Sequence, residues 1–315
     1  MRSIKEYFVL LLKGIAMGSA DVVPGVSGGT IAFITGIYDE LLNSIKSVDA
    51  TAFRLLFQLK FKEFWSHING SFLITLVMGI AISIISLAKL ISFLLSTYPV
   101  LVWSFFFGLI IISAVLVARD IEKKDWKAII AGFAGIAIAY FITSASPAQT
   151  PEAWWFLLIS GAIAICAMIL PGISGAFILL ILGKYKYIIE AVETVDIGTL
   201  AIFAIGCIIG LLSFARLISW FLRNFQSITV AVLAGFMVGS LNKVWPWKVV
   251  DTFRINSKGE QVPLFDHNVL PQVFLNETGQ DPQLMEALLM ASLGIFIVVA
   301  IEKIASMLNV KKASE

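Results

Sequence analysis

The chain has 315 residues, of which 59% are hydrophobic and only 14% are charged, and its mean hydropathy is +0.92. Soluble globular chains carry about 25% charged residues, so the composition excludes a soluble domain and indicates an all-α protein that crosses a membrane several times. The net charge of +2 is small and gives no indication of nucleic-acid binding. The two cysteines lie in apolar segments without metal or disulfide spacing, and we expect no metal and no cofactor.

The first apolar region covers residues 7–42 and is broken at Pro24-Gly25, within ADVVPGVSGGTIAFITG. A cleaved signal peptide is not expected, because Lys13 interrupts the apolar run. Residues 49–65 mix large apolar and basic side chains, which favours an amphipathic helix in the membrane interface over an ordinary loop. Apolar runs near the ~20 residues needed to cross a bilayer follow at 72–97, 99–118 and 128–145.

The second half begins with another broken apolar region, residues 154–192, interrupted at Pro171-Gly172 within AMILPGISGAFILLILG. Three further spans are predicted, with a long loop at 248–286 before the last. The two predicted halves are residues 1–145 and 153–308. The predicted spans of the second half are 200–222, 228–245 and 287–307.

An internal duplication relates the halves. An offset of 147 residues aligns the first Pro-Gly-x-Ser-Gly stretch with the second, and an offset of 127 aligns the later spans, including Lys89 with Arg216. Each half then holds one re-entrant helical hairpin and three transmembrane helices. Because that count of crossings is odd, the second repeat is expected to be inverted relative to the first, as in many secondary transporters.

The distribution of charge predicts the orientation. Basic residues concentrate in the loops that lie on the N-terminal side of the membrane, whereas the short loop at 146–152 has none. The positive-inside rule therefore places both termini in the cytoplasm. Lys184 and Lys186, which follow the second hairpin, stand against this orientation.

The Pro-Gly breaks predict hairpin tips, because non-helical backbone at membrane depth is tolerated only where protein or a watery cavity surrounds it. Serines after the breaks suit N-caps, glycines allow close approach of a ligand, and free N–H groups at a helix start bind anions. Alternatively, Pro-Gly only turns the chain and the small residues pack. The tip residues are Pro24, Gly25, Pro171 and Gly172, and the candidate substrate ligands are Ser27, Gly28, Gly29, Thr30, Ser174 and Gly175.

Lys89 and Arg216 lie inside apolar spans, where a cation costs about 2.5–3.5 kcal/mol on insertion scales. They face either an interior site or the interface, to which long side chains can extend. Two cations and two helix N-termini suit a phosphate-sized anion. Asp21 is the candidate for an ion pair or for a coupling proton, and its counterpart Met168 is apolar.

Four stretches resemble the polyprenyl-phosphate transporter family: GSADVVPGVSGGTIAFITGIYDELL, LPGISGAFILLILGKY, FARLISWFL and AGFMVGSLNKVWPW. The similarity runs from about residue 13 to 303. The resemblance implies a flippase, not an enzyme, that returns undecaprenyl phosphate from the outer to the inner leaflet of the bacterial cytoplasmic membrane, so that the carrier lipid is recycled in cell-wall synthesis. Its partners would be this lipid, membrane lipids and a coupling proton or sodium ion. Lys184 and Lys186 depart from the family pattern.

The expected mechanism holds the phosphate between the two tips, leaves the prenyl tail in lipid and exposes the site by rocking the repeats. A transporter or channel for a small soluble anion is the main alternative. A serine hydrolase is disfavoured because a serine nucleophile needs an adjacent base and the histidines, His67 and His267, lie outside the spans. A scaffold without transport does not account for cations inside the spans.

Overall fold

The computed structural model describes residues 2–23, 26–145, 150–151, 153–255 and 261–313. The predicted tip residues Pro24 and Gly25 lie outside the described residues. Side chains are not described for residues 88, 92, 193, 253–265 and 304–313.

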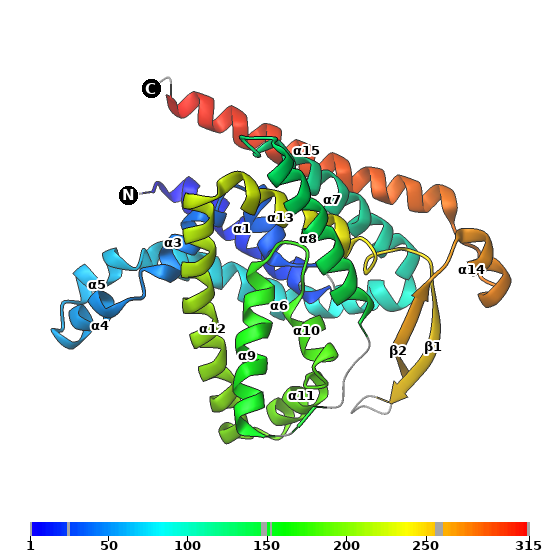
Figure 1. Cartoon of the computed structure of the whole chain (residues 1–315), viewed down its shortest axis with the longest axis horizontal. Coiled ribbons are helices and arrows are strands. Elements are labelled where there is room, and N and C mark those ends of the chain that lie inside the picture. Colours follow the sequence, from blue (N-terminus) through cyan, green and yellow to red (C-terminus); the bar gives the residue numbers. More distant parts are fainter. Residues whose placement is uncertain (1, 24–25, 146–149, 152, 256–260, 314–315) are drawn as a thin grey trace.

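The chain is an all-α polytopic membrane protein, as the composition predicted (Figure 1). Within the described residues, five helices are long and apolar enough to cross a membrane, and two shorter apolar helices accompany them. The five are α6 (Gly70–Thr97), α7 (Pro99–Arg119), α8 (Trp126–Ser144), α12 (Ile197–Asn224) and α15 (Leu284–Ala313); the shorter two are α9 (Trp154–Ile169) and α13 (Gln226–Ser240).

The first broken region folds as a helical hairpin. Lys13 Nζ on its first helix donates to the carbonyl of Thr35 at 2.6 Å, so the second helix runs back along the first. The first helix also runs parallel to α6, because Gly14 packs on Leu76 and Gly18 on Ile80. Both therefore start on the same side of the molecule. The three helices of this region are α1 (Ile4–Val22), α2 (Gly28–Ile34) and α3 (Tyr38–Lys46).

The second broken region repeats this arrangement. Gly161 packs on Phe203 and Gly210 on Ala162, so α9 runs parallel to α12, and the two lie side by side in Figure 1. The helices after the break are α10 (Gly175–Ile181) and α11 (Tyr185–Glu193). Counterparts match in length: α2 and α10 have 7 residues, α3 and α11 have 9, and α6 and α12 have 28.

The direction of α13 bears on the predicted inversion. Gly132 of α8 faces Ala231, and Gly239 packs on Ile136, so α13 runs parallel to α8. Since α8 is the span that crosses back after α7, α13 crosses in the direction opposite to α7, its counterpart. Inverted repeats require this relation, and the inversion relative to a membrane stays a prediction.

Two predicted segments differ from the structure. The expected single interfacial helix at 49–65 is two helices, α4 (Ala50–Phe57) and α5 (Phe61–His67), because Leu59 adopts a left-handed φ of 56° that ends the first. The long segment 248–286 is not only loop. It forms the antiparallel strands β1 (Lys248–Ile255) and β2 (Gln261–Asn268), then α14 (Pro271–Thr278).

These segments distinguish two faces of the molecule. In Figure 1, α1 begins and α15 ends toward the upper left, which we call the terminal face, and β1, β2 and α14 lie at the right, on the strand face. Asn242 after α13 donates to Ser144 at the end of α8 over 3.1 Å, and its carbonyl accepts from Asn268 of β2 at 2.7 Å, which places both helix ends at the strand face. The predicted span 228–245 ends early, at Ser240, where turns replace the helix.

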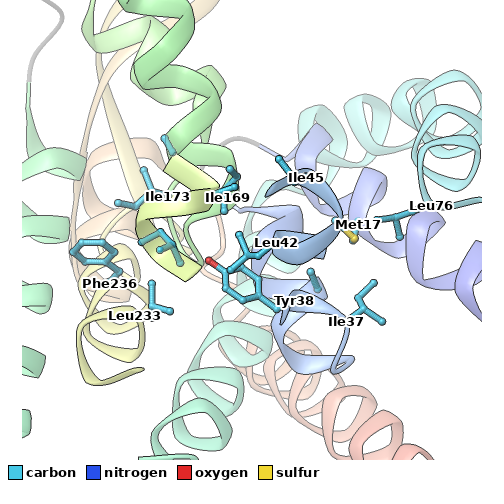
Figure 2. Packing of buried hydrophobic residues seen from close by; sticks show 14 of the residues in the cluster. Met17, Ile37, Tyr38, Leu42, Ile45, Leu76, Ile169, Ile173, Leu233 and Phe236 are labelled. Carbon is cyan, nitrogen blue, oxygen red and sulfur yellow. The ribbon is translucent and has the colours of Figure 1, made fainter. Parts of the chain in front are cut away.

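The largest buried cluster lies where the hairpins meet. Met17 of α1 and Leu76 of α6 lie at one side of it, and Leu233 and Phe236 of α13 lie at the other, with Tyr38 between them (Figure 2). The core therefore joins the two repeats and does not separate them.

The close packing of helices at glycine residues can be tested by substitution. A Cβ at Gly206 of α12 would overlap the carbonyl oxygen of Leu158, whereas one at Gly132 of α8 would meet Ala231 at an ordinary 3.6 Å. We expect Gly206→Ala to destabilise the protein by about 1–3 kcal/mol, as overpacking does. The matched Gly132→Ala should be neutral or stabilising, because alanine favours helix. Thermal melting in detergent measures both, and equal melting temperatures would contradict the packing of α9 on α12.

Candidate functional site: the two hairpin tips

The first tip is closed by its own side chains. Ser27 is the N-cap of α2, and its Oγ accepts from the Gly29 N–H at 3.1 Å. The carboxylate of Asp21, at the end of α1, accepts from the Gly28 N–H at 2.7 Å. A Cβ at Gly28 would lie 2.6 Å from Asp21 Oδ2, so glycine is required for the carboxylate to approach the backbone. An anion of the protein itself therefore occupies the start of α2.

The two tips contact each other directly. Ser27 Oγ donates to the carbonyl of Met168 at 2.9 Å, and the Gly172 N–H donates to Thr30 Oγ1 at 3.0 Å. Ser27 and Thr30 are completely buried. A Cβ at Gly29 would lie 2.5 Å from the Ile169 carbonyl oxygen. The sequence predicted that these residues share one site, and the structure brings them together in a tight, closed contact.

The second tip lacks the carboxylate. Met168 packs on Gly175, with its Cγ 2.6 Å from where a Cβ would lie, in the place that Asp21 takes beside Gly28. Ser174 precedes α10 but makes no side-chain cap. The start of α10 therefore has neither the hydroxyl cap nor the carboxylate that satisfies α2.

The two predicted intramembrane cations are directed elsewhere. Arg216 is exposed and donates to the carbonyls of Leu212, at 3.2 Å, and Val48, at 3.0 Å. Its guanidinium therefore lies at the junction between α3 and α4. Lys89 is exposed on α6. Among the described contacts, none joins either cation to a tip.

Other lysines lie at the open ends of the hairpins. Lys13 bonds the Thr35 carbonyl at the end of α2, as described above. Lys184, at the end of the second hairpin, is 2% exposed; its Nζ donates to the Thr150 carbonyl at 3.3 Å and lies over the rings of Phe156 and Tyr187. It is thus buried in the hairpin, whereas Lys186 is exposed and pairs with Glu190.

A polar pocket of about 510 Å³ lies beside the first hairpin at the terminal face. Arg223 of α12, Gln226 of α13 and Asp39 of α3 line it, together with Tyr38. Tyr38 is 3% exposed, and its hydroxyl has no hydrogen-bond partner within the described part of the chain. Figure 2 shows that hydroxyl pointing from α3 toward the second repeat. The sequence analysis did not find this pocket, because its lining residues come from separate helices.

An apolar cavity of about 620 Å³, largely open to the molecular surface, lies between α7, α8 and α13. Aliphatic and aromatic side chains line it almost throughout, and Lys124 lies at its edge, in the turn before α8. Its chemistry suits a hydrocarbon chain near a negative headgroup.

The comparisons with known proteins decide the family. The model of the undecaprenyl phosphate translocase-like family matches residues 17–262, which include both tips. The chain belongs to this family. The family model covers α2 and α10 but ends before α14 and α15.

Two similar proteins cover most of the chain. A polyprenyl-phosphate transporter of Vibrio cholerae serotype O1 (strain ATCC 39315 / El Tor Inaba N16961) is 50% identical over 300 residues, 95% of this chain and 97% of that protein. A polyprenyl-phosphate transporter of Staphylococcus aureus (strain NCTC 8325 / PS 47) is 34% identical over 257 residues, which are 76% of this chain and 86% of that protein. No solved structure matches. The family and these relatives are named as transporters, not as enzymes.

The contact between the tips generates a prediction. Thr30→Val removes the acceptor for the buried Gly172 N–H and should destabilise the protein by about 1–3 kcal/mol, the cost of an unpaired buried donor. Thr30→Ser keeps a hydroxyl and is the matched control, expected to melt close to the unsubstituted protein. Thermal unfolding in detergent provides the comparison. A valine variant as stable as the serine variant would show that the bond between the tips contributes nothing.

Proposed function

We propose that this chain is a flippase for a polyprenyl phosphate, and that the contact between the tips is its central gate. The observation that carries the proposal is the direct hydrogen bonding of Ser27 and Thr30 to the second tip. Such a contact closes the path at the middle of the protein and opens if the repeats rock apart. The family and the names of the two relatives support this substrate class.

In the proposed cycle, the headgroup replaces contacts that the tips make with each other. Opening frees the hydroxyls of Ser27 and Thr30 and exposes Ser174 beside the start of α10. A phosphate accepting from these hydroxyls and from the N–H groups of Gly28, Gly29 and Gly175 would occupy the position that Asp21 now fills at α2. Asp21 would then be released, and it is the group we assign to coupling with a proton or a sodium ion.

Lys89 and Arg216 belong to this proposal only if the repeats rearrange. Because Arg216 bonds Val48, an opening that moves α12 away from α3 would free its guanidinium to turn toward the headgroup. If Arg216→Ala transports the lipid at the full rate, Arg216 does not belong to the site.

We also propose the location and direction. The terminal face would be cytoplasmic in a bacterial inner membrane, and transport from the outer to the inner leaflet would return the carrier lipid for reuse. Burial of Lys184 supports this orientation, because a lysine enclosed in the hairpin is not a loop charge of the kind that the positive-inside rule counts.

A soluble anion is the competing substrate, because the polar pocket at the terminal face would admit one. The apolar cavity between α7, α8 and α13 favours the lipid, since a soluble anion gains nothing from a hydrocarbon surface. Liposomes containing the protein distinguish the two. We expect undecaprenyl phosphate to equilibrate between leaflets while trapped inorganic phosphate stays inside, and the reverse result would establish the soluble substrate.

Paired serine substitutions test the role of the tips. Ser27→Ala with Ser174→Ala removes one hydroxyl from each tip, and we expect undecaprenyl phosphate flipping to slow by roughly tenfold or more, because hydrogen bonds to a charged group are strong. Ser160→Ala is the control, since that buried hydroxyl bonds only the Phe156 carbonyl of its own helix among the described residues. Leaflet exchange in liposomes measures all three proteins. An unimpaired double variant would exclude the tips as the phosphate site.

A further inference from the structure

Three charged side chains meet where α13 ends and the strands begin. Lys243 follows α13, Lys248 is the first residue of β1 and Asp266 lies in β2. The Nζ atoms of Lys243 and Lys248 approach the same oxygen, Asp266 Oδ1, at 3.4 and 3.7 Å. Two ammonium groups thus share one carboxylate oxygen. We call these three residues the dilysine cluster.

The cluster is sheltered from water. The side chains of Lys243 and Lys248 are only 18% and 10% exposed. Lys243 Nζ lies 4.9 Å from the ring centre of Phe177, and Lys248 Nζ lies 5.7 Å from that of Trp103. Aromatic faces attract cations but supply no neutralising charge. Among the side chains that the structure describes, Asp266 supplies the one negative charge of the cluster, so one positive charge is left unbalanced in a half-buried setting.

Its position links the cluster to the second hairpin. Phe177 is the third residue of α10, directly after the tip residues Ser174 and Gly175. Gly172 of the same tip packs on Met237 of α13, and the chain reaches Lys243 six residues later. The ammonium groups therefore lie beside the second tip, on the strand face.

Burial has the largest effect on the charge of Lys248. Burial lowers the pKa of Lys248 to about 8, and repulsion by Lys243 adds to this, although Asp266 acts in the opposite direction. The other charged groups of the β1–β2 hairpin with a described partner, His267 and Asp251, pair with each other at 2.8 Å. A bound anion would relieve the repulsion between the lysines.

We propose that the dilysine cluster binds the phosphate monoester headgroup of a lipid at the strand face, next to the second tip. A phosphate monoester carries about −1.5 to −2 charge at pH 7 and three strong acceptor oxygens, which matches two ammonium groups. Asp266 holds the lysines together while the site is empty and competes with the headgroup. The identification of the lipid rests on the proposed function, whereas the binding of a phosphate monoester does not.

Because Asp266 competes with the headgroup for the lysines, substitutions of the lysines and of Asp266 should change the affinity in opposite directions. Lys243→Gln and Lys248→Gln should each weaken binding of farnesyl phosphate by roughly tenfold or more, since each removes a charged donor. Asp266→Asn should strengthen binding severalfold, because it removes the competing charge. Lys186→Gln is the control, since Lys186 is 67% exposed and already paired one-to-one with Glu190. Titration of the full-length protein in detergent measures affinity, and thermal melting confirms that each variant is folded.

Titrations with farnesol and with inorganic phosphate distinguish a lipid phosphate from free phosphate as the ligand. Farnesol lacks the charge, so the affinity for farnesol should be the same in every variant. Inorganic phosphate bound as tightly as farnesyl phosphate, with the same dependence on the lysines, would overturn the lipid assignment in favour of free phosphate. Protection of Lys248 from an amine-modifying reagent by farnesyl phosphate, read by peptide mass spectrometry, places the ligand at the cluster.

The pH dependence of farnesyl phosphate binding supplies an independent readout. Because the pKa of Lys248 is lowered to about 8, its charge is present below that pH and is lost as the pH rises through it. Binding of farnesyl phosphate should therefore weaken between pH 7 and 9, and Lys248→Gln should remove this dependence.

Two results would overturn the proposal: unchanged affinity in both lysine variants, or an Asp266→Asn variant that loses affinity as they do, which would make the cluster only an anchor for the strands. Flipping of undecaprenyl phosphate in liposomes is scored separately. If the protein flips lipid but its affinity for farnesyl phosphate does not depend on the cluster, this inference alone is refuted. If the unsubstituted protein does not flip undecaprenyl phosphate, the proposed function is refuted.

Discussion

Two hydroxyl groups of one hairpin satisfy backbone groups of the other, and the architecture at the centre of the protein depends on this exchange. Ser27 donates to the Met168 carbonyl, and Thr30 accepts from the Gly172 N–H. Both backbone groups flank a break in a helix, where the helical hydrogen bonds are lost. Unpaired groups at membrane depth cost several kcal/mol each. The second break is therefore tolerated because side chains of the first hairpin compensate for it, which ties the two repeats together at the tips.

The two copies contribute unequally to this contact. Asp21 supplies a carboxylate to the Gly28 N–H, whereas Met168 supplies only apolar contact to Gly175. The first tip therefore satisfies its own helix start, and the second depends on what approaches it. In the proposed cycle, such a difference would give the headgroup unequal affinity for the two tips.

The sequence predicts the helices well because their signals are local. Length and apolarity define α6, α7 and α8, and the repeated Pro-Gly-x-Ser-Gly defines both breaks. The direction of a side chain around its helix depends instead on tertiary packing, so Arg216 was assigned to the tips and is found at Val48, 168 residues away in the chain. The partners of Ser27 and Thr30 lie 141 and 142 residues away. Nothing local in the sequence links Lys243 and Lys248 to Asp266, so the sequence analysis did not single them out.

The placement of charge is compatible with the proposed passage of a phosphate headgroup. A fixed cation at the central contact would stabilise a bound dianion in a medium of low dielectric constant, where attraction between charges is strongest. Binding must be strong enough for entry and weak enough for release. In the described structure the tips meet through neutral hydroxyls and peptide groups, while Arg223 lines the pocket at one face and the dilysine cluster lies at the other. In the proposed cycle, cations at the two faces would attract the headgroup, and neutral donors at the centre would let it pass.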